Sequence, residues 1–156
     1  MIKTNAMRLL EQAALPFRAV EYAFDEHDLN GMHVSEQTGI PPEQVFKTLV
    51  ARGEKCGILV FCIPVCCELD LRKAARAAGD KKVEMIHVRE LQSITGYIRG
   101  GCSPVGMKKQ YPTFIDETAA LYDEIAISGG ARGLQIVIAP ENLLPYVHMK
   151  EADLTQ

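Results

Sequence analysis

Two apolar stretches decide which fold this chain can adopt: Val45-Phe46-Lys47-Thr48-Leu49-Val50, and the run from Ile58 to Pro64. Both have the length and apolar character of β-strands that are covered on both faces. Lys47 interrupts the first stretch, and a lysine inside a central strand is costly unless its charge is paired or opens into a cleft. Two interpretations of Lys47 follow: a functional cation in a cleft, or a lysine of an edge strand that reaches water.

Strand and helix signals alternate around these two stretches, with short connections between them. Asp70 stands at the N-cap position of a predicted helix, and Gly39 and Gly79 stand where a left-handed residue closes a helix. Helices are predicted at residues 4–14, 32–38 and 71–78, and further strands at residues 17–22, 83–86, 113–115, 125–128 and 134–139. This order favours an α/β (α+β) fold in which a mixed, largely antiparallel sheet forms a partly closed barrel with peripheral helices.

The composition bounds the class of protein. The length of 156 residues fits one domain, residues 1–156, and the apolar content of 47% with a net charge of −3 excludes a disordered chain. No run approaches about 18 apolar residues, so no membrane span is expected. No apolar export signal follows Met1, and a cytoplasmic protein with five reduced cysteines is predicted. The cysteines and histidines lack zinc spacing, so neither a metal nor a cofactor is predicted.

The net charge hides an uneven distribution along the chain. Residues 72–109 carry nine basic and three acidic side chains, a net of +6, and the remainder of the chain therefore carries −9. A run of charges is often only the solvated face of a helix. Here the basic side chains continue from a predicted helix into a glycine-rich loop, which weakens that interpretation.

Two glycine-rich segments are candidate parts of a binding site. Residues 96–106 contain four glycines and a proline, and residues 128–133 read Ser-Gly-Gly-Ala-Arg-Gly between two apolar strands. Such loops let the backbone approach a ligand, and their N–H groups can hold a phosphate or carbonyl oxygen. Plain turn formation is the alternative for both segments. Neither matches a phosphate loop or a dinucleotide-binding turn, so nucleotide hydrolysis and hydride transfer have no support.

No catalytic triad can be identified in the sequence. Cys102 is the one thiol inside a glycine-rich segment, but no histidine partner for it is evident. Ser103 and Ser128 also lack a visible base, and the four histidines are scattered. The pattern indicates a pocket of backbone amides and one lysine rather than a hydrolytic triad.

Six motifs, taken together and in order, resemble a known family. They are residues 45–49, 69–75, 81–85, 95–97, 100–106 and 128–134. The ordered set closely resembles the YbaK/EbsC family of Cys-tRNA(Pro) deacylases, relatives of the editing domain inserted in bacterial prolyl-tRNA synthetases. The resemblance covers nearly the whole chain and implies the same fold, a partly closed barrel around a pocket.

The resemblance also implies an activity and a site. The chain would be a trans-editing hydrolase that removes the amino acid from mischarged Cys-tRNA(Pro), with the thiol of the substrate attacking its own ester carbonyl. Lys47 matches the essential family lysine and would hold the 3′-terminal adenosine, and the backbone of Gly100 and Gly101 would stabilise the oxyanion. The expected substrate-binding residues are Tyr22, Thr48, Tyr97, Ser103, Pro104, Ser128, Gly129, Arg132 and Gln135.

The expected partners are the acceptor end of tRNA and, in a ternary complex, prolyl-tRNA synthetase. With a tRNA substrate, the segment of net charge +6 gains a partner in the tRNA phosphates. The residues expected to contact phosphates are Arg72, Lys73, Lys81, Lys82, Arg99 and Lys108.

Two positions depart from the family pattern and leave the substrate open. Many relatives carry a carboxylate where this chain has Gln135, and relatives can carry an aromatic residue where Leu29 and Met32 are the candidates here. The alternatives are therefore a deacylase for another amino acid, such as Ala-tRNA(Pro), and a non-catalytic module that binds the tRNA end.

Overall fold

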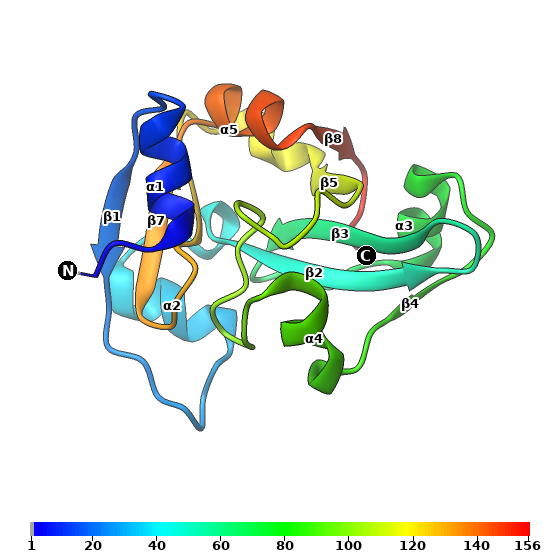
Figure 1. Cartoon of the computed structure of the whole chain (residues 1–156), viewed down its shortest axis with the longest axis horizontal. Helices are drawn as coiled ribbons and strands as arrows, with labels where there is room; N and C mark the ends of the chain where they lie inside the picture. The colour runs from blue at the N-terminus through cyan, green and yellow to red at the C-terminus, as the bar shows by residue number, and fades with distance from the viewer. Residues whose placement is uncertain (1) are drawn as a thin grey trace.

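A long hairpin forms the centre of a five-stranded sheet. The computed structural model describes residues 2–156, and its strands β2 (Phe46–Gly53) and β3 (Gly57–Pro64) pair antiparallel over their whole length (Figure 1). The sheet order is β4-β2-β3-β5-β8, with β4 at Val83–Met85, β5 at Thr113–Asp116 and β8 at Met149–Ala152. The β3–β5 and β5–β8 pairs are parallel, so the sheet is mixed, as predicted.

A second, three-stranded antiparallel sheet lies beside the hairpin. Its order is β1-β7-β6, with β1 at Arg18–Glu21, β6 at Ile125–Ser128 and β7 at Leu134–Ile138. Among the described residues, one parallel bridge, Val45 to Ala126, connects it to β2. The predicted barrel is wrong: neither sheet is closed, because β4 pairs with β2 alone and β8 with β5 alone, which leaves the outer edges of both strands open.

Helices pack on these sheets, and their ends follow from local sequence. They are α1 (Asn5–Gln12), α2 (Gly31–Thr38), α3 (Leu71–Ala78), α4 (Val88–Thr95) and α5 (Pro140–Val147), with 3₁₀ turns η1 (Pro42–Gln44) and η2 (Glu117–Leu121). Asp70 caps α3 by accepting the N–H groups of Arg72 and Lys73, and Gly79 closes it in the left-handed conformation. None of the helices in residues 2–156 is long and apolar enough to cross a membrane.

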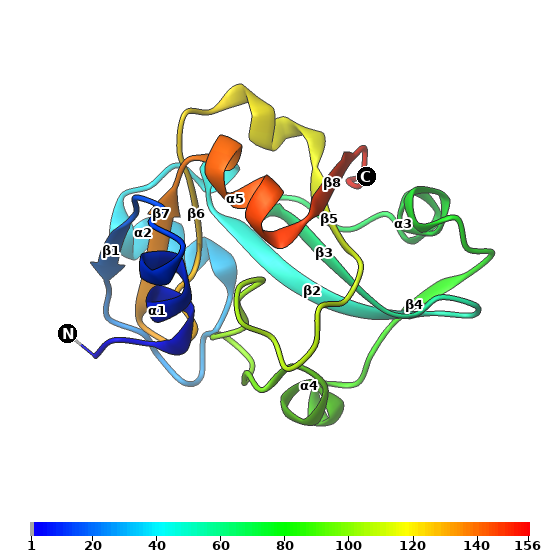
Figure 2. The same cartoon turned by 45° about the horizontal axis from the view of Figure 1, so that its top comes forward.

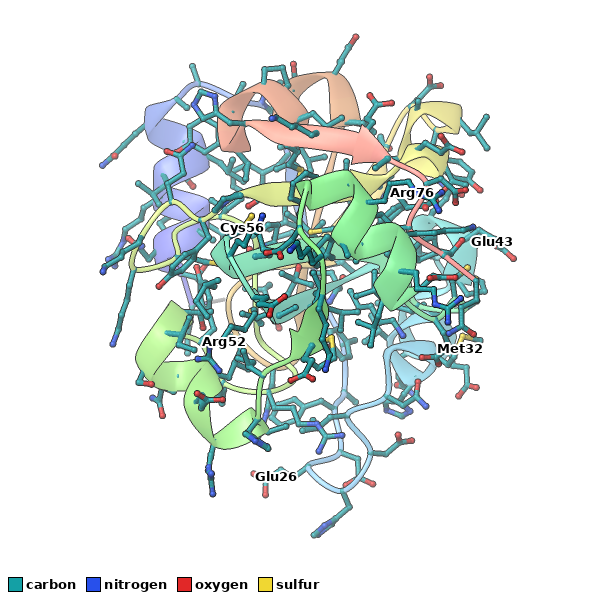
Figure 3. All side chains as sticks on the ribbon, turned by 90° about the vertical axis from the view of Figure 1, so that its right-hand side faces the viewer. Glu26, Met32, Glu43, Arg52, Cys56 and Arg76 are labelled. Atoms are coloured by element: carbon teal, nitrogen blue, oxygen red, sulfur yellow. The ribbon has the colours of Figure 1, made fainter. Side chains whose placement is uncertain are left out.

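The two faces of the five-stranded sheet carry different helices. Ala74 and Ala75 of α3 pack with Phe61 and Ile63, which point to one face of β3. Residues of alternate parity, such as Val60, instead pack against α4 and Tyr97 on the other face. Figure 2 shows α3 and α4 on either side of the β2–β3 hairpin. Arg52 of β2 is directed toward α4 (Figure 3), where it donates to Glu90 at 3.0 Å.

The sequence did not indicate every element. The prediction was close for two helices, 71–78 and 32–38, and for strands β1 to β7. Their observed bounds lie within a few residues of the predicted ones. The predicted helix at 4–14 is shorter, because Ala14 already has a φ of +58°. The helices α4 and α5 and the strand β8 were not predicted: α5 contains Pro145, and β8 depends on a pairing with distant β5.

Candidate functional site: a cavity at an open strand edge

A cavity of about 340 Å³ lies where the two sheets meet. Its floor is β2, and its walls come from the start of α2, the end of β4, the start of α4 and the first glycine-rich segment. Side chains from β6 and β7 complete it. The sequence-predicted residues that line it are Lys47, Thr48, Arg99, Gly100, Ser128 and Gln135.

The cavity exists because one edge of β2 is left without a partner strand. On that side β4 pairs only with residues 51–53, and the bridge to β6 is at Val45. Val50 accepts the Ile86 N–H across this edge at 3.3 Å, so strand alternation directs the N–H and C=O of Thr48 to the same side, away from β3. Thr48 therefore directs its backbone N–H and C=O toward the open edge, and its hydroxyl lies 3.7 Å from the Cys62 thiol.

Lys47 and Arg99 make the cavity positive. Lys47 is half-buried, and within residues 2–156 its ammonium group makes neither a hydrogen bond nor an ion pair. Arg99 is exposed at the rim, and the lining contains no Asp or Glu. Two cations without a counter-charge in a partly desolvated cavity favour an anionic ligand, such as a phosphate or a developing oxyanion.

The first glycine-rich segment turns sharply at the cavity wall. Gly101 donates its N–H to the Ile98 carbonyl at 3.0 Å, and Gly100 has a φ of +85°, as the third residue of a type II turn requires. Gly100 lines the cavity. The expectation that Gly101 offers a free N–H to an oxyanion needs correction, because the turn already uses that group. Gly101 instead lets the backbone of this segment pack closely against Ala131, since a Cβ on Gly101 would lie 3.2 Å from the Ala131 backbone.

The second glycine-rich segment supports the first. Arg132 donates from Nε to the Arg99 carbonyl at 2.9 Å, so its guanidinium holds the turn rather than lining the cavity. The Thr4 hydroxyl, at the N-cap of α1, donates to the Gly129 carbonyl at 2.6 Å. The Ser128 hydroxyl accepts the Gly130 N–H at 3.2 Å and faces the cavity. Of the predicted binding residues here, Ser128 reaches the cavity, and Gly129 and Arg132 do not line it.

Three other predicted binding residues lie behind the wall. The Tyr97 hydroxyl donates to the Val105 carbonyl, and burial raises the pKa of Tyr97 to about 12. Ser103 is fully buried and accepts the Val105 N–H at 3.2 Å, and Pro104 is also buried. The structure therefore gives Tyr97, Ser103 and Pro104 contacts that shape the loop and does not bring them to the lining.

Gln135 is buried at the base of the cavity. It pairs with Ser128 across the β6–β7 ladder and is only 5% exposed. Its Oε1 has no hydrogen-bond partner among the described residues. A buried acceptor left unpaired costs about 1–3 kcal/mol, so Gln135 has a reason to accept a donor from a ligand.

Tyr22 occupies a neighbouring hollow of about 20 Å³. This hollow shares Leu29, Val34 and Gly100 with the main cavity, and Arg132 also lines it. Tyr22 thus lies next to the cavity rather than in it. Leu29, one of the two candidates for the position of an aromatic in relatives, does line the cavity, whereas Met32 is exposed.

Cys102 lines the cavity but is poorly suited to act as a nucleophile. Burial raises the pKa of its thiol to about 12, so it stays protonated at neutral pH. Most of the apolar lining has no local signal in the sequence, because those side chains come from segments whose approach depends on tertiary contacts. They are Val34, Val65, Met85, Val88 and Leu91.

The predicted phosphate contacts do not form one patch. Arg72 and Lys73 belong to α3, on the sheet face away from α4, and Lys73 donates to Asp153 at 3.1 Å. Lys82 pairs with Glu84 at 2.9 Å beside exposed Lys81. Arg99 lines the cavity, and Lys108 lies outside the lining, where it donates to the Ser93 carbonyl of α4 at 3.2 Å.

The part of the chain that the structure describes contains no group of three or more His, Cys, Asp or Glu side chains placed to hold a metal ion.

Comparison with known proteins places this arrangement in a family. The model of the aminoacyl-tRNA editing domain matches residues 32–146. A protein of Enterococcus faecalis (strain ATCC 700802 / V583), named provisionally as a Cys-tRNA(Pro)/Cys-tRNA(Cys) deacylase, EbsC, is 50% identical over 98% of this chain and 93% of its own.

Solved structures agree with the sequence match. One, described provisionally as a trans-editing enzyme for prolyl-tRNA synthetase, is 28% identical, with a TM-score of 0.84 over 100% of this chain and 99% of that chain. Another, of a hypothetical protein, is 19% identical with a TM-score of 0.86 over 96% and 97% of the two chains, and shows the fold alone. The chain therefore belongs to the aminoacyl-tRNA editing domain family.

Proposed function

We propose that this protein is a trans-editing hydrolase that removes cysteine from mischarged Cys-tRNA(Pro). The observation that carries the proposal is the cavity at the open edge of β2, where Lys47 and Arg99 line a space to which residues 2–156 contribute no carboxylate. The name of the E. faecalis relative supports the same substrate. An enzyme that acts on charged tRNA is expected to work in the cytoplasm.

Among residues 2–156, the cavity lining includes no His, Asp or Glu side chain that could activate Ser128 or Cys102 as a nucleophile, and this supports a substrate-assisted reaction. The substrate thiolate attacks its own ester carbonyl, a C–S bond forms, and the C–O bond to the terminal ribose breaks. The proton lost by the thiol passes to the leaving ribose oxygen, and water later opens the cyclic thioester.

Lys47 holds the terminal phosphate or ribose, and the turn at Gly100 lies against the oxyanion. Ser128 and Gln135 orient the aminoacyl group, and Tyr22 supports the adjoining wall.

The partner of this site is the acceptor end of tRNA, and we propose a ternary complex with prolyl-tRNA synthetase. A cavity of about 340 Å³ can hold an aminoacyl group and part of a ribose, and leaves tRNA identity to contacts elsewhere. Gel filtration of this protein with the synthetase and tRNA(Pro) tests the complex. Co-elution of all three supports it, and elution of this protein apart from the other two contradicts it.

Substitution of Lys47 tests the site itself. With Cys-tRNA(Pro), Lys47→Ala should lower kcat/KM by about 100-fold or more, because a preorganised charge contact in a desolvated site is worth roughly 3 kcal/mol. Lys47→Arg keeps the charge but changes its shape and should retain partial activity. Thermal unfolding of both variants controls for folding. A well-folded Lys47→Ala protein as active as the wild type would overturn the assignment.

A further inference from the structure

Two neighbouring thiols lie at the end of β3, outside the cavity. Cys66 is exposed and Cys67 is partly exposed, both are free, and their Sγ atoms are 3.9 Å apart. They occupy the end of a tight turn in which the Cys67 N–H donates to the Pro64 carbonyl at 3.0 Å. Nothing in the proposed deacylation uses them.

The turn that carries these thiols is joined directly to the cavity wall. Val65, the residue before Cys66, donates its N–H to the Val45 carbonyl at 2.8 Å and lines the cavity. Its side chain also packs tightly under the start of α2, since a Cβ on Gly31 would lie 2.5 Å from Val65 Cγ1. A change of backbone at Cys66 therefore moves a residue on which both the cavity wall and α2 rest.

We propose that Cys66 and Cys67 form a redox modification site, which low-molecular-weight disulfides convert to a vicinal disulfide, and that this closure alters the cavity through Val65. The oxidation stands on the thiol geometry alone. Its effect on activity rests on the proposed deacylase function.

The chemistry is two successive thiol–disulfide exchanges. The exposed Cys66 thiolate attacks a glutathione disulfide, forms a mixed disulfide and releases one glutathione thiolate. The Cys67 thiolate then attacks the Cys66 sulfur, forms the Cys66–Cys67 bond and releases the second glutathione. The two thiol protons pass to the two released thiolates. Burial, the neighbouring Cys66 and the charge of Asp116 raise the pKa of Cys67, while the charge of Lys47 opposes this rise. Exchange begins at Cys66 because its thiol is the more exposed of the two.

The product is expected to be readily reversible. Adjacent Cα atoms are about 3.8 Å apart across a trans peptide, whereas most disulfides join Cα atoms about 4.4–6.8 Å apart. A bridge outside that range is strained and easily reduced, which is the property of labile, regulatory disulfides rather than structural ones.

Mass spectrometry of the oxidised protein tests the site. The reference protein is Cys56→Ser, which removes the other exposed thiol. Cys56 lies at the tip of the β2–β3 hairpin, far from Met32 of α2 (Figure 3), so its substitution should not disturb α2. With glutathione disulfide it should lose two hydrogens, with the bond mapped to Cys66 and Cys67. Adding Cys66→Ser or Cys67→Ser should abolish that loss. Stable glutathione adducts on the reference protein, or no reaction, would overturn the proposal.

Two readouts test the coupling to the cavity. Oxidation of the reference protein should change amide hydrogen exchange in α2 and lower kcat/KM for Cys-tRNA(Pro) at least about fivefold, with dithiothreitol restoring both. The variant that also lacks Cys66 and Cys67 should show neither response. A disulfide that leaves α2 exchange and activity unchanged would overturn the coupling. An inactive reduced protein that still forms the disulfide would instead count against the deacylase function.

Discussion

At the scale of single residues, Lys47 and Tyr97 show what the sequence could and could not predict. Lys47 interrupts an apolar strand pattern, and that local contrast in the sequence alone is enough to mark it as a candidate. Tyr97 has no such contrast, and the direction of its hydroxyl is set by Val105 in a folded-back loop. Side chains in glycine-rich loops were therefore predicted as a group, although only some of them reach the cavity.

Gly101 provides a residue-scale prediction. Gly101→Ala places a methyl group 3.2 Å from the Ala131 backbone and should force the two glycine-rich segments apart. We expect a loss of about 1–3 kcal/mol in the free energy of unfolding and a large fall in deacylation. The matched control is Gly39→Ala, where φ is +75° but no atom lies within 4 Å. It should cost about 1–2 kcal/mol through backbone strain and leave deacylation unchanged. Equal activity in both variants would contradict the close-contact role of Gly101.

At the scale of elements, the site depends on what β2 does not pair with. The pattern at residues 45–50 predicted a strand, but no local signal predicts that β4 leaves it at Ala51 and so opens an edge. The same limit explains why strand β8 was not predicted: it pairs with β5 from the far end of the chain. The predicted barrel failed for this reason as well, because closure is a property of strand order and not of any single stretch.

Asp80 provides an element-scale prediction about pH. Its carboxylate accepts the N–H groups of Lys55 and Cys56 and so ties the hairpin tip to the end of α3. These backbone hydrogen bonds lower the pKa of Asp80 from 3.8 to about 2, and the bond from the Cys56 N–H has the largest effect. Because the folded-state pKa is depressed, the stabilisation is fully present above about pH 4 and is lost as the pH falls toward 2.

Thermal unfolding of the Asp80→Asn variant as a function of pH checks the predicted stabilisation by the Asp80 carboxylate. The variant should have a lower Tm than the wild type at pH 7, and the difference should shrink as the pH falls through the acid range. A Tm difference that stays constant from pH 7 to about pH 2 would show that the Asp80 charge contributes nothing.

At the scale of the whole molecule, the charge distribution limits where tRNA can lie. The segment of net charge +6 looked continuous in sequence, but the fold divides it between the α3 face and the α4 face of the central sheet. A tRNA end that enters the cavity would meet Arg99 at its rim, whereas Lys108 lies beside α4 and outside the lining.

Salt dependence of tRNA binding tests this division. Binding should weaken steeply between roughly 50 and 200 mM salt, because phosphate contacts release counterions. Arg99→Ala should lower the slope of log K against log salt by about 1, whereas Arg72→Ala, on the α3 face, should leave it nearly unchanged. An equal effect of both substitutions would indicate that tRNA wraps both faces, and a salt-independent affinity would exclude a dominant phosphate contact.

The most direct test of the central claim is the release of amino acids from a panel of tRNA(Pro) charged with cysteine, serine, alanine or proline. The substrate-assisted reaction predicts rapid release of cysteine, and much slower release of serine, which has nearly the same shape but lacks the thiol. Release of alanine without cysteine would assign a different editing substrate. Binding of all four charged tRNAs without turnover would contradict catalysis and leave a module that only binds the tRNA end.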